Sequence, residues 1–497
     1  MSLPSNVIVF MTDQHSPKML SCYGHPQVKT PNIDSLADSG IRFSSAYTPS
    51  PLCVPARASF ATGRYVHEIG CWDNAIAWAG QPEGWPQKLP TAGHETVSIG
   101  KLHFRSEEDP IGFSQRILPM HIADGVGELS GSIRPDLPRR TQGRKLAEDI
   151  GPGETSYTAY DRNITNEAIA WITKTSNSPP RDEVGNAISW VLYVSYICPH
   201  FPLSAPKEFY DMYDPSSIVI PKPYNADYIK KHPWWKAFHD SILFDEYFKD
   251  DSHRRKAIAN YYGLVSFADD NIGKVINALK RTNSYKNTHI FYTSDHGDNL
   301  GARKIWGKGT MHEESAGVPL ILSGPKIKEK VTISTPVSLL DIYPSILDCL
   351  NLVTNGEENE LRGASLFKII ENKNQEFSQR SILSEYHAAG ATSGVFMVRK
   401  GIWKYIHYTG YHSELFNLED DPEELKNLSY KKEYANILKD LTEELYSKLK
   451  PHTPESIDTR AKIDQANYIE KHGGRDFVLT QAQIHGSPVP GGESTRV

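Results

Sequence analysis

The chain has 497 residues and a net charge of −6, with 54 basic and 60 acidic side chains. This length suits one large domain with a smaller one beside it. The balanced charge argues against a nucleic-acid-binding stripe or a polybasic membrane patch, and no apolar run approaches the roughly 20 residues of a membrane span. We therefore expect a small-molecule partner, with no nucleic acid and no membrane.

The first apolar run, Asn6–Met11, begins so early that no basic segment or cleavage site of a secretory signal precedes it. Five cysteines are scattered along the chain without a C-x-x-C pair: Cys22, Cys53, Cys71, Cys198 and Cys349. An odd number of widely spaced cysteines argues against a disulfide framework. Both observations predict a cytoplasmic protein with reduced thiols.

Short apolar runs that end in polar residues recur at Val7–Met11, Trp190–Ile197, His289–Tyr292 and Val318–Leu322. Runs of this length between helical patterns predict buried strands of a mostly parallel sheet, covered on both faces. The predicted fold class is therefore α/β, a large mostly parallel sheet between helices. Ligands of such sheets bind at the carboxyl ends of the strands.

Helical patterning is clearest over Ala257–Arg281, where apolar residues recur at i, i+3 and i+4. A short helix is predicted at Asn32–Gly40, closed by Gly40. Stretches rich in glycine, proline and charge are predicted to be insertions or loops over the sheet: Ser106–Gly112, Ser130–Gly153 and Asp251–Lys256.

After residue 375 the pattern predicts strands at Arg380–Tyr386, Val395–Tyr408 and Glu414–Leu418, then a helix at Lys432–Lys448. This indicates a small antiparallel sheet with one packed helix. We divide the chain into a main domain (1–375), a C-terminal antiparallel α+β subdomain (376–455) and a C-terminal tail (456–497). The tail is expected to be loop-like, a composition compatible with wrapping a neighbouring subunit of a homo-oligomer.

The most informative segment contains Cys53-Val-Pro-Ala-Arg57, a C-x-P-x-R pentapeptide. A free cysteine is usually an ordinary small buried residue, and the pentapeptide alone arises by chance. The longer stretch, however, matches as well: Pro55, Arg57, Ser59, Thr62, Gly63 and Arg64. The segment resembles the modification signature of the type I sulfatases, in which a separate maturation enzyme oxidises the cysteine to a formylglycine aldehyde.

A hydrated aldehyde has two hydroxyl groups with separate tasks. One attacks sulfur or phosphorus, and deprotonation of the other later expels the bound group by C–O cleavage. The resemblance implies formylglycine at Cys53, a formylglycine-generating enzyme as partner, an alkaline-phosphatase-like fold for residues 1–375, and hydrolysis of a monoester.

Two strand ends carry clusters of metal-binding types, Asp13 with Gln14 and Asp295 with His296. Either cluster alone is more commonly a helix cap or a turn, but both together with Cys53 predict a site for one divalent ion that also binds the hydrated aldehyde. The ion would lower the pKa of the attacking hydroxyl. Ca²⁺ is expected first, with Mn²⁺ or Mg²⁺ as alternatives and Zn²⁺ also open.

The commonest sulfatase pattern is similar but has Asp-Asp at the first cluster and Asp-Asn at the second. Here Gln14 removes one negative charge and His296 supplies a softer nitrogen ligand. This combination resembles the choline-sulfatase-like enzymes and the phosphonate monoester hydrolases of the same superfamily.

The resemblance also assigns the groups that handle the anion. Arg57 would orient the formylglycine, Lys101 would bind the sulfate, and His103 would take the proton of the diol during release. His200, after the predicted strand at Trp190–Ile197, would be an anion ligand or the acid for the leaving group, and Lys308 would lie near the leaving oxygen. Each of these residues alone is more commonly a surface or packing residue.

Asn74 and Glu385 lie in segments that resemble the pocket of choline sulfatases. Asn74 would hydrogen-bond the sulfate, and Glu385 would neutralise a cationic leaving group. The segment Leu118–Glu128 offers no tryptophan for an aromatic cage, which argues against choline. The alternative for Glu385 is an ion pair with Lys404 across the small sheet.

Three hypotheses follow. The first is hydrolysis of a sulfate monoester. The second is hydrolysis of a phosphonate monoester or a phosphate diester with the same formylglycine machinery, favoured by Gln14 and His296. The third is an unmodified protein that captures an oxyanion without turnover.

Overall fold

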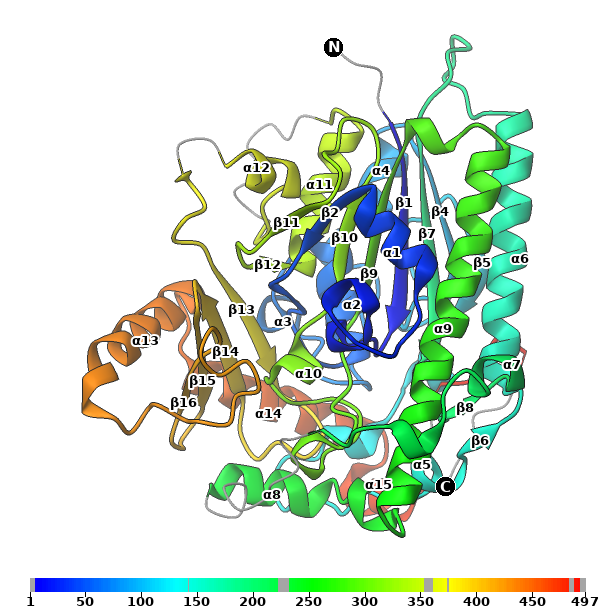
Figure 1. Ribbon diagram of the computed structural model, residues 1–497. Helices are drawn as coiled ribbons and strands as arrows, with labels where there is room; N and C mark the ends of the chain where they lie inside the picture. The colour runs from blue at the N-terminus through cyan, green and yellow to red at the C-terminus, as the bar shows by residue number, and fades with distance from the viewer. Residues whose placement is uncertain are drawn as a thin grey trace.

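The computed structural model describes residues 5–141, 143–221, 232–352, 361–372, 375–481 and 487–491. At its centre lies an eight-stranded sheet flanked by helices (Figure 1). In spatial order its strands are β11 (Val331–Ile333), β2 (Gly40–Phe43), β10 (Leu320–Ser323), β9 (Thr288–Ser294), β1 (Asn6–Asp13), β7 (Trp190–Pro199), β4 (Glu95–Lys101) and β5 (Gln115–Met120).

The sheet is mostly parallel, as predicted. Strands β9, β1, β7, β4 and β5 run in one direction. The run Val318–Leu322 forms β10, which is antiparallel to both of its neighbours, β9 and β2. The sequence pattern could not show this direction, because a buried antiparallel strand is as apolar as a parallel one.

Alternate residues of β1 face opposite layers, which accounts for its continuous apolar run. Val7, Val9 and Met11 pack in a cluster with residues of α2 (Cys53–Thr62), α4 (Trp85–Thr91) and α11 (Ile342–Cys349). Ile8 and Phe10 pack with residues of α6 (Ser156–Asn177) and α9 (Asp251–Arg281). Figure 1 shows α6 and α9 side by side along one flank of the sheet.

Two boundary predictions need correction. The predicted loop Asp251–Lys256 is the first part of α9, whose start is capped by Asp250 accepting from the backbone nitrogen of His253 at 2.8 Å. The helix expected at Asn32–Gly40 is α1 (Pro31–Asp38), and Gly40 begins β2 instead of closing α1. A Cβ on Gly40 would lie 2.3 Å from the carbonyl oxygen of Leu322, so this glycine permits close strand pairing.

The predicted loops differ in their outcome. Ser106–Gly112 contains no helix or strand, as expected. The predicted loop Ser130–Gly153 includes the end of a 3₁₀ turn (Leu129–Ser132), the short helix α5 (Gly143–Glu148) and strand β6 (Gly151–Pro152).

The small C-terminal sheet is antiparallel, as predicted, in the order β13 (Ser381–Tyr386), β14 (Val395–Lys400), β15 (Trp403–Tyr408) and β16 (Glu414–Asn417). Helix α13 (Ala435–Leu449) packs on it. The single strand expected at Val395–Tyr408 is a hairpin that turns at Gly401, where φ is +56°.

The prediction of a loop-like tail is wrong. Residues 454–480 form α14 (Pro454–Lys471) and α15 (Gly474–Thr480). The buried face of α14 includes Asp458 and Gln465 beside apolar residues, which is why it lacked a clear apolar stripe. Gln465 Nε2 donates to Asp73 Oδ2 at 2.8 Å and to the His387 carbonyl at 2.7 Å, so α14 packs on its own chain.

A buried ion network ties the small sheet to the main domain. Lys404 Nζ of β15 lies 2.8 Å from Glu313 Oε1 of α10 (Glu313–Ala316) and 2.8 Å from Glu424 Oε1. Glu424 Oε2 also accepts from the backbone nitrogen of Glu313 at 2.7 Å. Next to Glu313 in α10, Glu314 forms an ion pair with Arg303, with 3.0 Å between Oε2 and Nη1. The segment between Arg303 and Glu314, which carries Lys308, is therefore anchored to the small sheet.

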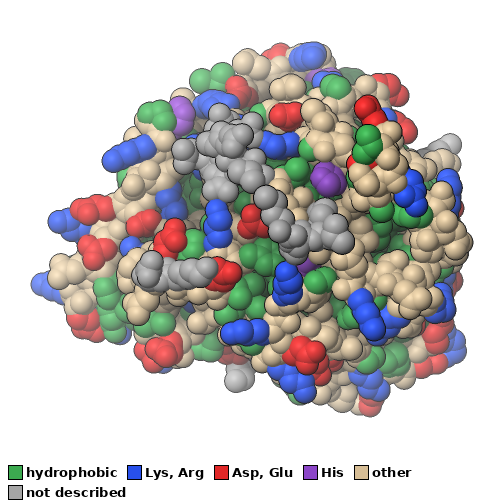
Figure 2. Space-filling view, turned by 90° about the horizontal axis from the view of Figure 1, so that it is seen from above, with side chains coloured by type: hydrophobic (Ala, Val, Ile, Leu, Met, Phe, Trp, Pro, Cys, Tyr) green, Lys and Arg blue, Asp and Glu red, His purple; other side chains and the backbone are tan. Residues whose placement is uncertain are grey.

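The face on which β1 begins carries interspersed basic and acidic side chains (Figure 2).

Within the described residues, every helix is too short or too polar to cross a bilayer.

We expect Lys404→Met to lower the free energy of unfolding by about 3–5 kcal/mol, because it takes the nearest cation from the buried carboxylate of Glu424 and from the partly buried carboxylate of Glu313. Urea denaturation would show this as a lower midpoint. Lys400→Met on the neighbouring strand is the matched control, since Lys400 is partly exposed in its pair with Glu444, and such pairs contribute about 0–1 kcal/mol. Equal midpoints for the two variants would contradict the assigned role of Lys404.

Candidate active site

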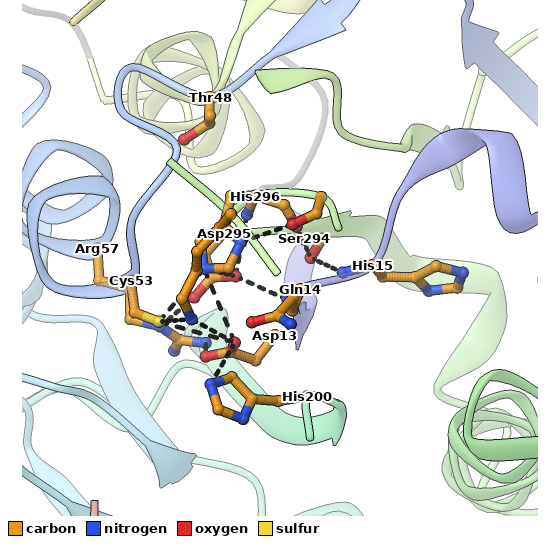
Figure 3. Close-up of polar contacts among 12 residues, drawn as sticks. Asp13, Gln14, His15, Thr48, Cys53, Arg57, His200, Ser294, Asp295 and His296 are labelled. Carbon is orange, nitrogen blue, oxygen red and sulfur yellow. Dashed lines mark hydrogen bonds and ion pairs between the residues drawn. The ribbon is translucent and has the colours of Figure 1, made fainter. Parts of the chain in front are cut away.

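The carboxyl ends of four neighbouring strands, β1, β9, β4 and β7, meet at one edge of the sheet. They carry Asp13, Asp295, Lys101 and His200, at or just beyond their last residues. Cys53 is the first residue of α2, and its side chain points toward Asp13 and His296 (Figure 3). The structure thus brings together Asp13 and His296, which are 283 positions apart in the sequence.

Four potential ligands cluster in the interior. One side-chain atom each from Asp13, Cys53, Asp295 and His296 lies within 4.8 Å of the others. Cys53 Sγ is 3.2 Å from His296 Nε2 and 3.8 Å from Asp13 Oδ1, and His296 Nε2 is 3.6 Å from Asp295 Oδ1. All four side chains are buried.

A backbone contact orients the His296 ring. Its Nδ1 donates to the carbonyl of Gly297 at 2.9 Å, which places the proton on Nδ1 and leaves the Nε2 lone pair facing the cluster.

The Gln14 amide is oriented by Asp298, a residue that sequence reasoning did not assign. Gln14 Nε2 donates to Asp298 Oδ2 at 2.5 Å, whereas the buried Gln14 Oε1 finds no hydrogen-bond partner among the described residues. An unpartnered buried oxygen is costly, and it is the atom that a cation would bind. Two carboxylates, an amide oxygen and an imidazole nitrogen therefore fit a divalent cation.

Two site residues have unusual backbone conformations. Gln14, directly after β1, has φ of +69°, and His103, just after β4, has φ of +54°. Residues other than glycine rarely adopt this left-handed region, and such strain concentrates at functional sites. At Gln14 the chain also bends, directly after the end of β1.

Gly100 allows β4 to approach β7 beside the site. Its φ is +102°, and a Cβ there would lie 2.2 Å from the carbonyl oxygen of Ser195. The register of β4 against β5 shifts between Ile99 and Lys101. Together these features position Lys101 and His103.

Arg57 contacts both carboxylates of the cluster, Asp13 and Asp295. Its guanidinium donates to Asp295 Oδ2 at 2.8 Å and to Asp13 Oδ2 at 3.3 Å. On the other side it donates to Ser195 Oγ at 2.8 Å and to Tyr193 Oη at 3.2 Å. Burial alone would lower the pKa of Arg57, but Asp295 raises it above its ordinary value. Arg57 therefore stays charged and holds both carboxylates in place.

Two lysines reach the same centre. Lys101 Nζ is 2.6 Å from Asp13 Oδ2, and Lys308 Nζ is 2.8 Å from Cys53 Sγ. Burial alone would raise the pKa of Asp13, but Lys101, Lys308 and their cationic neighbours hold it well below its ordinary value. The Asp13 carboxylate is therefore ionised.

The two histidines beside these lysines are neutral. Burial, together with Lys101, lowers the pKa of His103 well below its ordinary value, and burial with Lys308 does the same for His200. His200 Nδ1 hydrogen-bonds the Phe201 carbonyl at 2.7 Å, and its Nε2 lies 4.0 Å from Asp13 Oδ1.

One cavity opens onto this centre. Its lining includes Cys53, Lys101, His103, His200 and Lys308. Asn74 also lines it, and Asn74 Oδ1 accepts from the backbone nitrogen of Val54 at 3.2 Å. The outer wall is mainly apolar, and it includes Leu52, Ile122, Ile242, Phe244, Trp306 and Tyr386.

Glu385 is placed differently from both expectations. It is fully buried, with Oε1 2.9 Å from His67 Nδ1 and Oε2 3.0 Å from His387 Nε2, and it is not among the residues that line the cavity. The predicted ion pair with Lys404 is wrong, because Lys404 instead binds Glu313 and Glu424.

Sequence reasoning missed four site residues: Tyr193, Ser195, Asp298 and Ser487. Tyr193 and Ser195 carried a signal, since two polar groups at i and i+2 of a buried strand lie on one face. Asp298 stood at the end of the same motif as Asp295. Ser487 lies in the C-terminal tail, where the local sequence carried no signal.

A model of the family described as "Sulfatase" matches residues 5–352, and one described as "N-sulphoglucosamine sulphohydrolase, C-terminal" matches residues 301–450. The chain is 28% identical to a choline-sulfatase of Rhizobium meliloti (strain 1021), over 85% of this chain and 82% of that protein. It is also 28% identical to arylsulfatase K of Danio rerio, over 89% of this chain and 83% of that protein.

Among solved structures, the phosphonate monoester hydrolase of Agrobacterium radiobacter is similar with a TM-score of 0.72 and 22% identity, covering 89% of this chain and 95% of that one. The fold is therefore that of the alkaline-phosphatase-like sulfatases. The chain belongs to the sulfatase family, and its class is that of the sulfuric ester hydrolases. Membership implies a metal ion and a formylglycine, and the structure contains one buried group of potential ligands, Asp13, Cys53, Asp295 and His296, within the described residues.

We expect Asp298→Asn to weaken Ca²⁺ and Mn²⁺ binding by about 10- to 100-fold, the usual effect of losing a group that orients a metal ligand. In the wild type, Asp298 accepts from Gln14 Nε2 and from the backbone nitrogens of Leu300 and Gly307, the latter two at 2.7 and 3.0 Å. The amide nitrogen of the new side chain can only donate, so it would face one of these donors and lose that hydrogen bond. Calorimetric titration of each metal measures the change. Asp270→Asn, in a half-exposed pair with Lys274, is the control, and equal affinities for both variants would contradict the role of Asp298.

Proposed function

We propose that the protein hydrolyses a sulfate monoester, R–O–SO₃⁻, to the alcohol and sulfate, with a formylglycine derived from Cys53 as nucleophile. The observation that carries the proposal is the position of Cys53. Its Sγ lies at the start of α2 and contacts Asp13, His296 and Lys308. A helix N-terminus with cations beside it favours an incoming anion.

The proposed metal ligands are Asp13, Gln14, Asp295 and His296, together with modified residue 53, whose oxygen would take the place of Cys53 Sγ. Ca²⁺ is the proposed ion, because oxygen atoms dominate this set, with Mn²⁺ or Mg²⁺ as alternatives. The bound ion would supply Lewis acidity that lowers the pKa of the nucleophilic hydroxyl.

The remaining residues handle charge and protons. Lys101 and Lys308 would hold the sulfate oxygens, and Arg57 keeps the carboxylates Asp13 and Asp295 in place. His200 would serve the departing alcohol, either as an anion ligand or as its acid. His103 would accept the proton whose removal releases sulfate. Neutral His103 can accept a proton. Neutral His200, whose Nδ1–H is donated to the Phe201 carbonyl, would first have to take up a proton on Nε2 to act as the acid.

The alcohol would occupy the outer cavity. Asn74 is positioned beside residue 53 and would hydrogen-bond the sulfate. The wall contains Arg140 beside Glu128, a pair with no net charge, next to apolar side chains. Glu385 lies behind this wall, so any effect it has on a cationic substrate would act through His67 and His387.

The maturation enzyme would act on Cys53 before the chain has folded, because Cys53 is 1% exposed in the folded protein. All five cysteines are free, and this supports the proposal of a reducing, cytoplasmic compartment.

A second candidate is hydrolysis of a phosphonate monoester or a phosphate diester by the same machinery. The observation in its favour is the ligand set, in which Gln14 and His296 stand where the commonest sulfatase pattern has a second carboxylate and an amide. This ligand set places one negative charge fewer around the ion than the commonest sulfatase pattern does. Such a change would suit a substrate whose charge is distributed differently from that of a sulfate monoester.

We expect Cys53→Ala to fold normally and to lose turnover on the order of 10³-fold or more, because it lacks the nucleophile. Steady-state kinetics with an aryl sulfate measure the loss. The control is Cys71→Ala, another buried cysteine, which does not line the cavity. Full activity of Cys53→Ala would disprove the nucleophile assignment. A peptide mass that shows only a thiol at residue 53, without turnover, would support the oxyanion-binding hypothesis.

We expect kcat/KM to be higher for an aryl sulfate than for the matching aryl phosphonate, measured with metal-replete enzyme whose aldehyde at residue 53 has been confirmed. Cys53→Ala reports the background with each substrate. A dominant phosphonate rate would replace the sulfatase proposal with the second candidate.

A further inference from the structure

The C-terminal segment Ser487–Gly491 reaches the active site. Ser487 lines the same cavity as Cys53, Lys101 and Lys308, although it lies more than 400 positions after Cys53. Figure 1 shows the preceding helices α14 and α15 below the carboxyl ends of the strands, on the same side of the sheet as the site.

Three contacts hold this segment in place. Ser487 Oγ lies 2.7 Å from His103 Nε2, and the Ser487 carbonyl accepts from Tyr157 Oη at 2.9 Å. Val489 packs against the apolar cluster that joins α6 to the sheet. The ring of Tyr157 also lies edge-on to His200, with 6.0 Å between the ring centres. Ser487 therefore contacts one site histidine directly and is linked to the other through Tyr157.

The contact engages one nitrogen of His103 and leaves the other without a hydrogen-bond partner among the described residues. His103 Nδ1 is buried and has no hydrogen-bond partner among the described residues, whereas Nε2 is engaged by Ser487. A neutral imidazole has one donor and one acceptor nitrogen, and the partner of one nitrogen selects the tautomer. A hydroxyl that accepts from Nε2–H leaves the Nδ1 lone pair free to take a proton.

We propose that Ser487 is a positioning residue for His103, holding the ring in the tautomer whose Nδ1 accepts a proton during sulfate release. This inference rests on the proposed function. In that step Nδ1 takes the proton of the free hydroxyl on residue 53, a C=O bond forms there, and the C–O bond to sulfate breaks with its electron pair leaving on sulfate. Nε2–H continues to donate to Ser487, so the resulting imidazolium keeps its hydrogen bond.

The proposal predicts different effects on kcat and on kcat/KM. Release follows the first transfer, so kcat/KM does not report on it when that transfer is irreversible, whereas kcat does. We expect Ser487→Ala to lower kcat by about 10-fold, a part of what a general base contributes, and to leave kcat/KM for an aryl sulfate unchanged. Intact-mass measurement during turnover should show enzyme that carries one sulfo group.

The control variants use the same segment. Ser487→Thr keeps the hydroxyl and should restore kcat, and Pro490→Ala alters an exposed residue of the segment and should resemble the wild type. His103→Ala shows the effect of losing the base itself. A lower kcat/KM in Ser487→Ala with unchanged kcat would make Ser487 a substrate contact and overturn the proposal, as would unchanged values of both constants.

A second readout needs no turnover. The ring ¹⁵N shifts of His103, identified by comparison with His103→Ala, should show a protonated Nε2 in the unmodified protein and a mixture of tautomers in Ser487→Ala. Identical shifts in the two proteins would overturn the inference. Absence of sulfate turnover in the mature wild type, or full turnover by Cys53→Ala, would instead disprove the proposed function.

Discussion

The buried carboxylate of Asp13 is the charge around which the site is arranged. It is fully removed from solvent, and it is compensated by Arg57 at 3.3 Å and Lys101 at 2.6 Å. A buried charge without such partners would cost several kcal/mol. Asp13 therefore requires the cations, and their placement in turn depends on α2 and β4 being packed against β1 and β7.

This arrangement leaves little freedom to the surrounding chain. Arg57 extends from α2 to the middle of β7, where Tyr193 and Ser195 accept from its guanidinium. Lys308 lies in a segment that the ion network of Arg303, Glu314 and Lys404 anchors to the C-terminal sheet. The small sheet thus supports the active site without lining its charged centre, and preorganisation of this kind suits catalysis of charge transfer.

The elements were predicted well where one physical pattern dominated. The apolar runs of β1, β7 and β9 and the amphipathic stripe of α9 were recognised because burial requires them. Helix α14 was missed, since its buried positions include Asp458 and Gln465, whose partners lie on distant segments. The hairpin at Gly401 was missed because a tight turn between two strands barely interrupts the alternating pattern.

The candidate residues of the site were recognisable in the sequence because the chemistry needs particular groups: Cys53 in its motif, carboxylates at strand ends, and lysines and histidines for an anion. The tertiary structure alone decided their relations. It placed Glu385 behind the cavity wall, gave the Gln14 amide its orientation through Asp298, and brought Ser487 to His103. The physical reason is that the sequence shows directly which functional groups the chain carries. The hydrogen-bond partners and the burial of those groups depend instead on how segments hundreds of residues apart pack together.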